Sequence, residues 1–335
     1  ILAQGFGSAL LSSVQKASAS RLISAKFVER MGNRAGSESS RVCTATGASV
    51  GKFSEANVAG LRVMWQRPES EPVGVLFIAH GMCHGCYDWF NEEGFGGLPE
   101  EHSIIASALG RGFFVIVPSS TNRVQKAWDP DVDGPKVKEL VPSIMNAEGL
   151  PPTLPVFAFG ISNGGAFVLL LPCFMKLRAI CCQIMAIPGR TLGQIPNMPP
   201  VLFSHMPQDR RTASGVASNI TLLRDKGSIA EEQTFDPLAI KTDFFATRCG
   251  IDAETSAKML GSLEAAKLVD RGGYLKEDPR RTNWRPVLKE FADAVGDSLL
   301  PDKSPISEVL NVAWGNHEIT SEEFDVVLDF FSKHL

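Results

Sequence analysis

The chain has 335 residues, of which 44% are apolar and 21% are charged, enough to bury a full core as one large α/β domain or two smaller ones. Its net charge of −4 and pI near 5.9 provide no overall basic field, so nucleic acid is not expected as a partner. The longest apolar run, residues 166–175, is interrupted by Pro172 and is far shorter than the roughly 18 residues of a membrane-spanning helix. No transmembrane segment is expected.

The first 55 residues form an N-terminal extension that is basic and rich in serine. Residues 1–35 hold six serines, five basic residues and one acid. This composition is typical of a transit peptide and favours an organelle, plastid or mitochondrion, over the cytoplasm. The alternatives are a vector-derived remnant and a helix that docks on a protein partner.

Seven cysteines are scattered along the chain without regular spacing, which indicates a reducing compartment. Cys83 and Cys86 flank His84 and Gly85, but no second ligand pair follows at the spacing of a zinc site. We therefore expect neither a bound metal nor a cofactor.

Short apolar runs alternate with helical patterns from residue 56 onward, which predicts right-handed βαβ crossovers and a mostly parallel sheet with helices on both faces. The fold class is therefore a doubly wound α/β fold. Strands are expected at residues 58–65, 74–79, 113–117, 155–159, 179–186, 200–204 and 308–313. Helices are expected at residues 101–109, 134–147, 166–171, 252–269 and 321–334.

The segment 210–305 interrupts this rhythm, because it is far longer than a connection between the last two expected strands requires. We interpret it as a helical, lid-like insertion. The core is then divided into residues 56–209 and 306–335. Residues 270–281 also suggest a winged-helix fragment, but residues 210–298 contain 14 basic and 14 acidic residues and so have no net field for nucleic acid.

A glycine-flanked serine, Gly160-Ile161-Ser162-Asn163-Gly164, lies between an expected strand and an expected helix. In this context G-x-S-x-G forms a sharp turn that holds the serine in a strained conformation above the sheet. The glycines are needed where a Cβ would collide with the neighbouring strand or helix. Ser162 is therefore the candidate nucleophile.

A serine nucleophile requires a base and an acid, which in this type of fold follow it in the order Ser, Asp or Glu, His. Asp209 comes just after an expected strand and is the candidate acid, although it could instead cap a helix or form a surface ion pair. His317 comes after the last expected strand and is the candidate base, although it could merely precede the final helix. His205 is a rival base that precedes the acid.

Two backbone N–H groups are expected to form an oxyanion hole. One belongs to Asn163, and the other to Met82, or else to Cys83, just after the His80-Gly81 exit of a strand. Trp89 and Phe90 follow and could line an acyl pocket, although such aromatic residues are more often part of a core.

The motifs at residues 80–84, 96–100, 160–167 and 205–209 resemble the α/β-hydrolase superfamily across about residues 56–335. Residues 274–284 are similar to a narrower plant and algal group of these proteins whose substrate is unassigned. The superfamily resemblance implies a Ser162-Asp209-His317 triad. The interval between Asp209 and His317 is unusually long for the superfamily, which makes Asp302 the alternative acid.

The function expected from these features is a serine hydrolase that acts on a small-molecule ester or related acyl substrate. The competing hypothesis is a catalytically silent α/β-hydrolase fold that serves as a binding or scaffold subunit.

Overall fold

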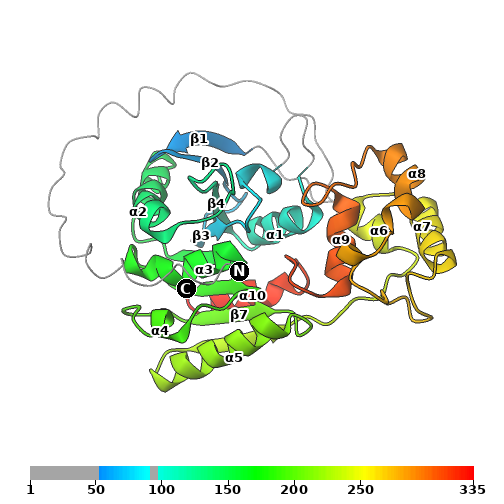
Figure 1. Cartoon of the computed structure of the whole chain (residues 1–335). Helices are drawn as coiled ribbons and strands as arrows, with labels where there is room; N and C mark the ends of the chain where they lie inside the picture. Colours follow the sequence, from blue (N-terminus) through cyan, green and yellow to red (C-terminus); the bar gives the residue numbers. More distant parts are fainter. Residues whose placement is uncertain (1–52, 91–96) are drawn as a thin grey trace.

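The computed structural model describes residues 53–90 and 97–335, so the predicted N-terminal extension lies almost wholly outside the described residues. An eight-stranded sheet forms the body of the molecule (Figure 1). The strands lie in the spatial order β1-β2-β4-β3-β5-β6-β7-β8. Their bounds are β1 (Ser54–Val58), β2 (Leu61–Gln66), β3 (Gly74–Ala79), β4 (Phe113–Pro118), β5 (Val156–Ile161), β6 (Ile180–Gln183), β7 (Val201–His205) and β8 (Ala230–Thr234).

The sheet is parallel except at β2, which is antiparallel to both β1 and β4. The central strand β3 is buried along its whole length, because helices cover both faces and its apolar run never alternates with polar residues. It pairs with β5 so that Ala79 lies opposite Gly160. This strand order, with helices on both faces, is the α/β-hydrolase fold, and the predicted doubly wound class is confirmed.

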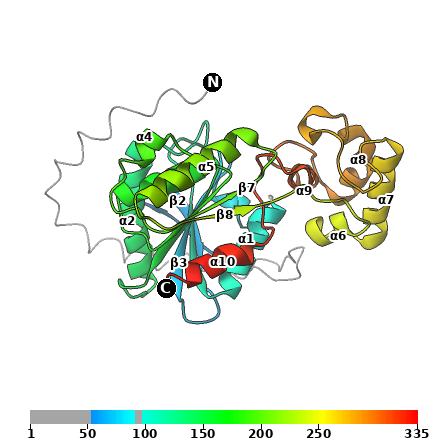
Figure 2. The same ribbon diagram turned by 90° about the horizontal axis from the view of Figure 1, so that it is seen from below.

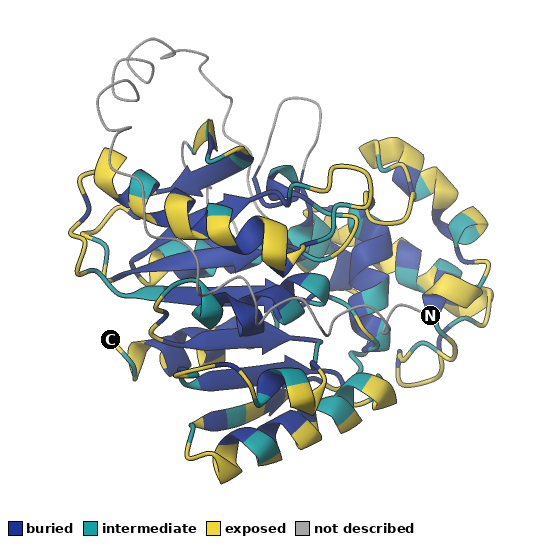
Figure 3. Ribbon diagram, turned by 60° about the vertical axis from the view of Figure 1, so that its left-hand side comes forward, coloured by how far each residue is buried: buried dark blue, intermediate teal, exposed yellow. Residues whose placement is uncertain are grey.

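Two layers of helices enclose the sheet (Figure 2). One face packs against α2 (Pro130–Ala147), α3 (Asn163–Leu170), α4 (Gly189–Leu192) and α5 (Arg210–Asp225). The other packs against α1 (Pro99–Gly110) and α10 (Phe324–Ser332). Figure 3 shows that the strands are buried and that the helices on either side of them expose their outer faces. Within the described ranges, every helix is too short or too polar to span a bilayer.

Between β8 and the final helix lies a helical region, residues 238–314, which projects to one side of the sheet (Figure 1). It consists of α6 (Phe244–Cys249), α7 (Ala253–Ala265), the 3-10 helix η4 (Pro279–Arg281), α8 (Arg285–Val295) and α9 (Pro305–Trp314). These elements share a hydrophobic core of their own, which includes Met259, Leu263, Trp284 and Leu288. Two further 3-10 helices are η2 (Cys86–Asp88) and η3 (Leu171–Cys173).

The predicted strand at residues 308–313 is wrong, because these residues belong to α9. The apolar side chains Ile306, Val309, Leu310 and Ala313 follow helical spacing and are all buried. The Ser304 side chain caps the helix, and Gly315 ends it with a φ of 71°. The short apolar run resembles a buried strand only when these signals at its ends are ignored.

The predicted position of the insertion, between the last two strands, is also wrong. Residues 210–234 form α5 and the edge strand β8, which pairs with β7 in the same sheet. The sequence of β8 is polar because only one of its edges is paired and several of its side chains reach solvent. The helical region therefore follows the last strand of the sheet.

The turn from β5 into α3 allows an unusually close approach to β3. A Cβ on Gly164 would lie 2.2 Å from the carbonyl oxygen of Ala79 and 2.4 Å from that of His80. Since both obstacles are backbone atoms, neither can move without displacing the strand. Gly164 therefore sets the distance between helix and sheet.

We expect Gly164→Ala to lower the free energy of unfolding by at least about 3 kcal/mol, because overpacking here is against backbone. Gly261→Ala is the matched control, since Gly261 lies in the exposed interior of α7 and nothing lies within 4 Å of the point that its Cβ would occupy. Replacing that glycine should raise stability by about 0.5–1 kcal/mol. Urea unfolding followed by circular dichroism measures both, and equal effects would contradict the argument.

Candidate active site

Ser162 occupies the turn between β5 and α3 with φ 51° and ψ −116°, a conformation that residues other than glycine rarely adopt. The flanking glycines make it possible. A Cβ on Gly160 would lie 2.3 Å from the carbonyl oxygen of Gly164. The Ser162 N–H donates to the carbonyl of Gln183 on β6, which ties the turn to the neighbouring strand. This is the geometry of a nucleophile elbow.

His317 reaches this serine from the segment between α9 and α10. Its Nε2 lies 3.0 Å from Ser162 Oγ. The backbone of His317 has a φ of 49°, so this residue too is held in the left-handed region. Its side chain remains 43% exposed, which leaves the imidazole accessible from solvent.

Asp209 is the hydrogen-bond partner of the other imidazole nitrogen. Its Oδ2 lies 2.6 Å from His317 Nδ1, while its Oδ1 accepts the N–H of Thr212 and so caps α5. The two interpretations of this residue, acid partner and helix cap, are therefore both satisfied at once. Burial by itself would raise the pKa of Asp209, but the hydrogen bonds from His317 and Thr212 lower it from 3.8 to about 2.

These contacts define how protons are arranged. An ionised Asp209 accepts only, so the hydrogen between it and His317 belongs to Nδ1. In the neutral imidazole, Nε2 is then the unprotonated nitrogen and accepts the Ser162 hydroxyl hydrogen. A hydroxyl that donates to an unprotonated imidazole is poised for proton abstraction.

The His80 ring shapes the loop that follows β3. Its Nδ1–H donates to the carbonyl of Gly81, and its Nε2 accepts the N–H of Ser120. Burial lowers the pKa of His80 to about 3, so the ring is neutral, as this pair of contacts requires. Because a trans peptide directs C=O and N–H in opposite directions, the Met82 N–H is directed away from this buried ring.

The other predicted oxyanion donor is the backbone N–H of Asn163, the first residue of α3. The N–H groups in the first turn of a helix have no acceptor within the helix, and the helix dipole favours negative charge there. The Asn163 side chain accepts the N–H of Trp128, whose indole N–H donates to the carbonyl of His80. Trp128 thus connects the elbow with the His80-Gly81 loop, a role that its sequence position did not reveal.

Two of the predicted roles do not fit the structure. Cys83, the fallback oxyanion donor, directs its N–H to the carbonyl of Gln125 at 3.4 Å. Trp89 and Phe90 are 0% exposed and pack in the core cluster beneath α1 and α10, so neither ring is available to a substrate. Their large apolar area is satisfied by core packing.

The rival base and the rival acid lie elsewhere. His205 is buried, and its Nε2 contacts Glu232 on β8 at 2.8 Å. Asp302 lies in the turn before α9, whereas the carboxylate in contact with His317 Nδ1 belongs to Asp209. Among the residues that the structure describes, no group of His, Cys, Asp or Glu side chains could hold a metal ion.

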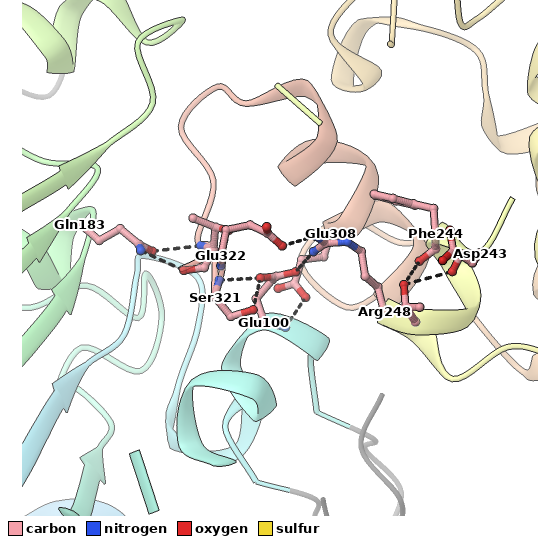
Figure 4. A network of polar contacts seen from close by, with 10 residues as sticks. Glu100, Gln183, Asp243, Phe244, Arg248, Glu308, Ser321 and Glu322 are labelled. Atoms are coloured by element: carbon pink, nitrogen blue, oxygen red, sulfur yellow. Dashed lines mark hydrogen bonds and ion pairs between the residues drawn. The ribbon is translucent and has the colours of Figure 1, made fainter. Parts of the chain in front are cut away.

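A polar network fixes the segment after His317 (Figure 4). The Gln183 side chain makes two hydrogen bonds to the backbone of Thr320, and Glu100 accepts both the N–H and the hydroxyl of Ser321. Arg248 of the helical region joins Glu100 to Glu322. The Gln183 carbonyl also accepts the Ser162 N–H, so one residue of β6 holds both Ser162 and the segment that follows His317.

No model of a known protein family matches the chain, and no curated protein matches it in sequence. Several solved structures show a distant structural similarity to it. A carboxyl esterase from Bacillus coagulans is 10% identical, with a TM-score of 0.45 over 55% of this chain and 90% of that one. Esterase PE8 is 15% identical, with a TM-score of 0.43, and the match covers 57% of this chain and 94% of that one.

A third similar structure is the acylaminoacyl peptidase of Pyrococcus horikoshii, which is 13% identical with a TM-score of 0.43. The match covers 71% of this chain and 44% of the peptidase. At these identities and TM-scores the likenesses carry no argument about function, which has to be argued from the site.

The pKa of Asp209 leads to a stability prediction. A lowered pKa means that Asp209 stabilises the fold above its ordinary pKa of 3.8 and loses this effect as the pH falls through about 2. We therefore expect the difference in unfolding free energy between wild type and Asp209→Asn to shrink between about pH 4 and about pH 2. Asparagine retains the helix cap, so the comparison isolates the charge together with its hydrogen bond to His317. A difference that stays constant in urea titrations across this range would contradict the assignment.

Proposed function

We propose that this protein is a serine hydrolase that cleaves an ester or related acyl substrate through an acyl-enzyme on Ser162. The observation that carries the proposal is the continuous hydrogen-bond chain from Ser162 through His317 to Asp209, with the serine held at a positive φ. A buried structural serine would not need this strained turn or an unprotonated imidazole nitrogen beside its hydroxyl.

In acylation, His317 Nε2 takes the hydroxyl proton while Ser162 Oγ attacks the carbonyl carbon of the substrate. The carbonyl oxygen becomes negatively charged, and the N–H groups of Asn163 and Met82 donate to it. When the tetrahedral intermediate collapses, the bond to the leaving group breaks and His317 returns the proton to that group. The acyl group remains bonded to Ser162.

Deacylation reverses the roles. A water molecule gives a proton to His317 and attacks the acyl carbon, and the second tetrahedral intermediate releases the acid as Ser162 regains its proton. Asp209 stays ionised throughout, which its lowered pKa of about 2 supports. It keeps the Nδ1–H tautomer and stabilises the imidazolium that forms in each step.

This scheme requires only a substrate with an activated carbonyl, which makes a small-molecule ester or thioester the expected class. The scheme uses no cofactor or metal. A catalytically silent scaffold remains the competing outcome of the experiments below, and no contact among the described residues of the site specifically favours it.

We expect a fluorophosphonate probe to label the wild-type protein, because Ser162 Oγ displaces fluoride from phosphorus and the resulting phosphonate ester is stable. Ser162→Ala should abolish labelling. Ser204→Ala is the matched control, since this buried serine on β7 lies outside the hydrogen-bond chain. Intact-protein mass spectrometry measures the adduct. A folded wild-type protein that remains unlabelled would contradict the proposal.

Asp209→Asn should lower kcat for a short-chain nitrophenyl ester by roughly 10³- to 10⁴-fold, because asparagine cannot hold the required tautomer. Asp302→Asn serves as the control and should leave kcat close to that of the wild type. The opposite ranking of the two variants would transfer the acid role to Asp302.

A further inference from the structure

Arg280, on the 3-10 helix η4 of the helical region, contacts the loop that carries His317. Its Nη1 donates to the carbonyl of Asn316 at 3.0 Å. Its Nη2 donates to the carbonyl of His317 at 3.2 Å and to Glu318 Oε2 at 2.9 Å. One guanidinium therefore binds three consecutive residues, with the histidine in the middle.

This loop needs external support. The backbone of His317 lies in the left-handed region, which persists only where surrounding contacts hold it. The half-exposed imidazole is not enclosed by packing, so the position of its Nε2 depends on the direction of the Cα–Cβ bond. Contacts to the carbonyls of residues 316 and 317 fix the two peptide planes that set this direction.

Arg280 is itself firmly anchored. The Asp278 side chain caps η4 by accepting the Arg280 N–H at 2.9 Å, and its Oδ1 also lies 3.5 Å from Arg280 Nη1. The indole N–H of Trp284 donates to the carbonyl of Pro279 at 3.0 Å. Because Trp284 is buried in the core of the helical region, the guanidinium projects from a supported segment rather than from a free loop.

We propose that Arg280 is a positioning residue for the base, through which the helical region holds His317 within reach of Ser162 and Asp209. This inference rests on the proposed function. The planar fork of arginine suits two adjacent carbonyls and a carboxylate, whereas a lysine ammonium offers a single point of contact. Arg280 therefore acts on the rate of the serine reaction and leaves the binding of its substrate largely unchanged.

The test compares Arg280→Met and Arg280→Lys with Arg281→Met. Methionine keeps the apolar stem and removes the donors, and Arg281 is the exposed neighbour on the same short helix. The rate of fluorophosphonate labelling is measured against probe concentration in the full chain, which separates apparent affinity from limiting rate.

We expect Arg280→Met to lower the limiting rate by about 10- to 100-fold, with apparent affinity within about twofold of the wild type. The limiting rate of Arg280→Lys should lie between those of Arg280→Met and the wild type. The limiting rate of Arg281→Met should equal that of the wild type. A merely structural role would instead alter stability without this ordering of limiting rates.

The failures are distinguishable. A wild type that does not label overturns the proposed function and this inference with it. A labelled wild type with an equally fast, folded Arg280→Met variant overturns the positioning role alone, as does a loss confined to apparent affinity. If Arg280→Met does not fold, the Arg280→Lys variant tests the positioning role instead. A limiting rate of Arg280→Lys within about twofold of the wild type overturns this role, and a slower rate at unchanged apparent affinity supports it.

Discussion

The close approach of α3 to β3 is the constraint on which the site depends. Gly164 lies so near the carbonyls of Ala79 and His80 that no larger residue fits. This contact places the first turn of α3 beside the loop that follows β3, and hence the Asn163 N–H beside the His80-Gly81 segment. Trp128 reinforces the arrangement because it hydrogen-bonds to both sides and stacks on Phe167 of α3. Backbone packing thus fixes the distance between the first turn of α3 and the loop that follows β3.

The imidazole depends on contacts from more distant parts of the chain. Asp209, 108 residues earlier, comes from the start of α5, where its second oxygen is committed to the helix cap. The cap prevents rotation of the carboxylate, so one residue serves both helix stability and histidine orientation. From the other side Gln183 and Glu100 hold residues 320 and 321. The position of His317 is therefore overdetermined, which is what a residue at a positive φ requires.

The parts of this structure that sequence could predict are those with strong local signals. The apolar runs of β3, β4 and β5 and the glycines around Ser162 are such signals. Ser162 and Asp209 each follow a strand, as expected, whereas His317 follows the helix α9. The polar edge strand β8 gave no such signal, and α9 was mistaken for a strand although Ser304 and Gly315 delimit a helix. Trp128, Gln183 and Arg280 could not be found, because their importance lies in contacts between residues distant in sequence. Local pattern does not encode those contacts.

The long interval between Asp209 and His317 has a structural reason, because α5 and the edge strand β8 belong to the core around the sheet. What remains between β8 and His317 is the helical region, which has its own core and contributes Arg248 and Arg280 to the segment around the histidine. These contacts attach the helical region to residues on both sides of His317 in the sequence. Because both arginines reach the same short segment from separate elements, movement of the helical region would be transmitted to His317.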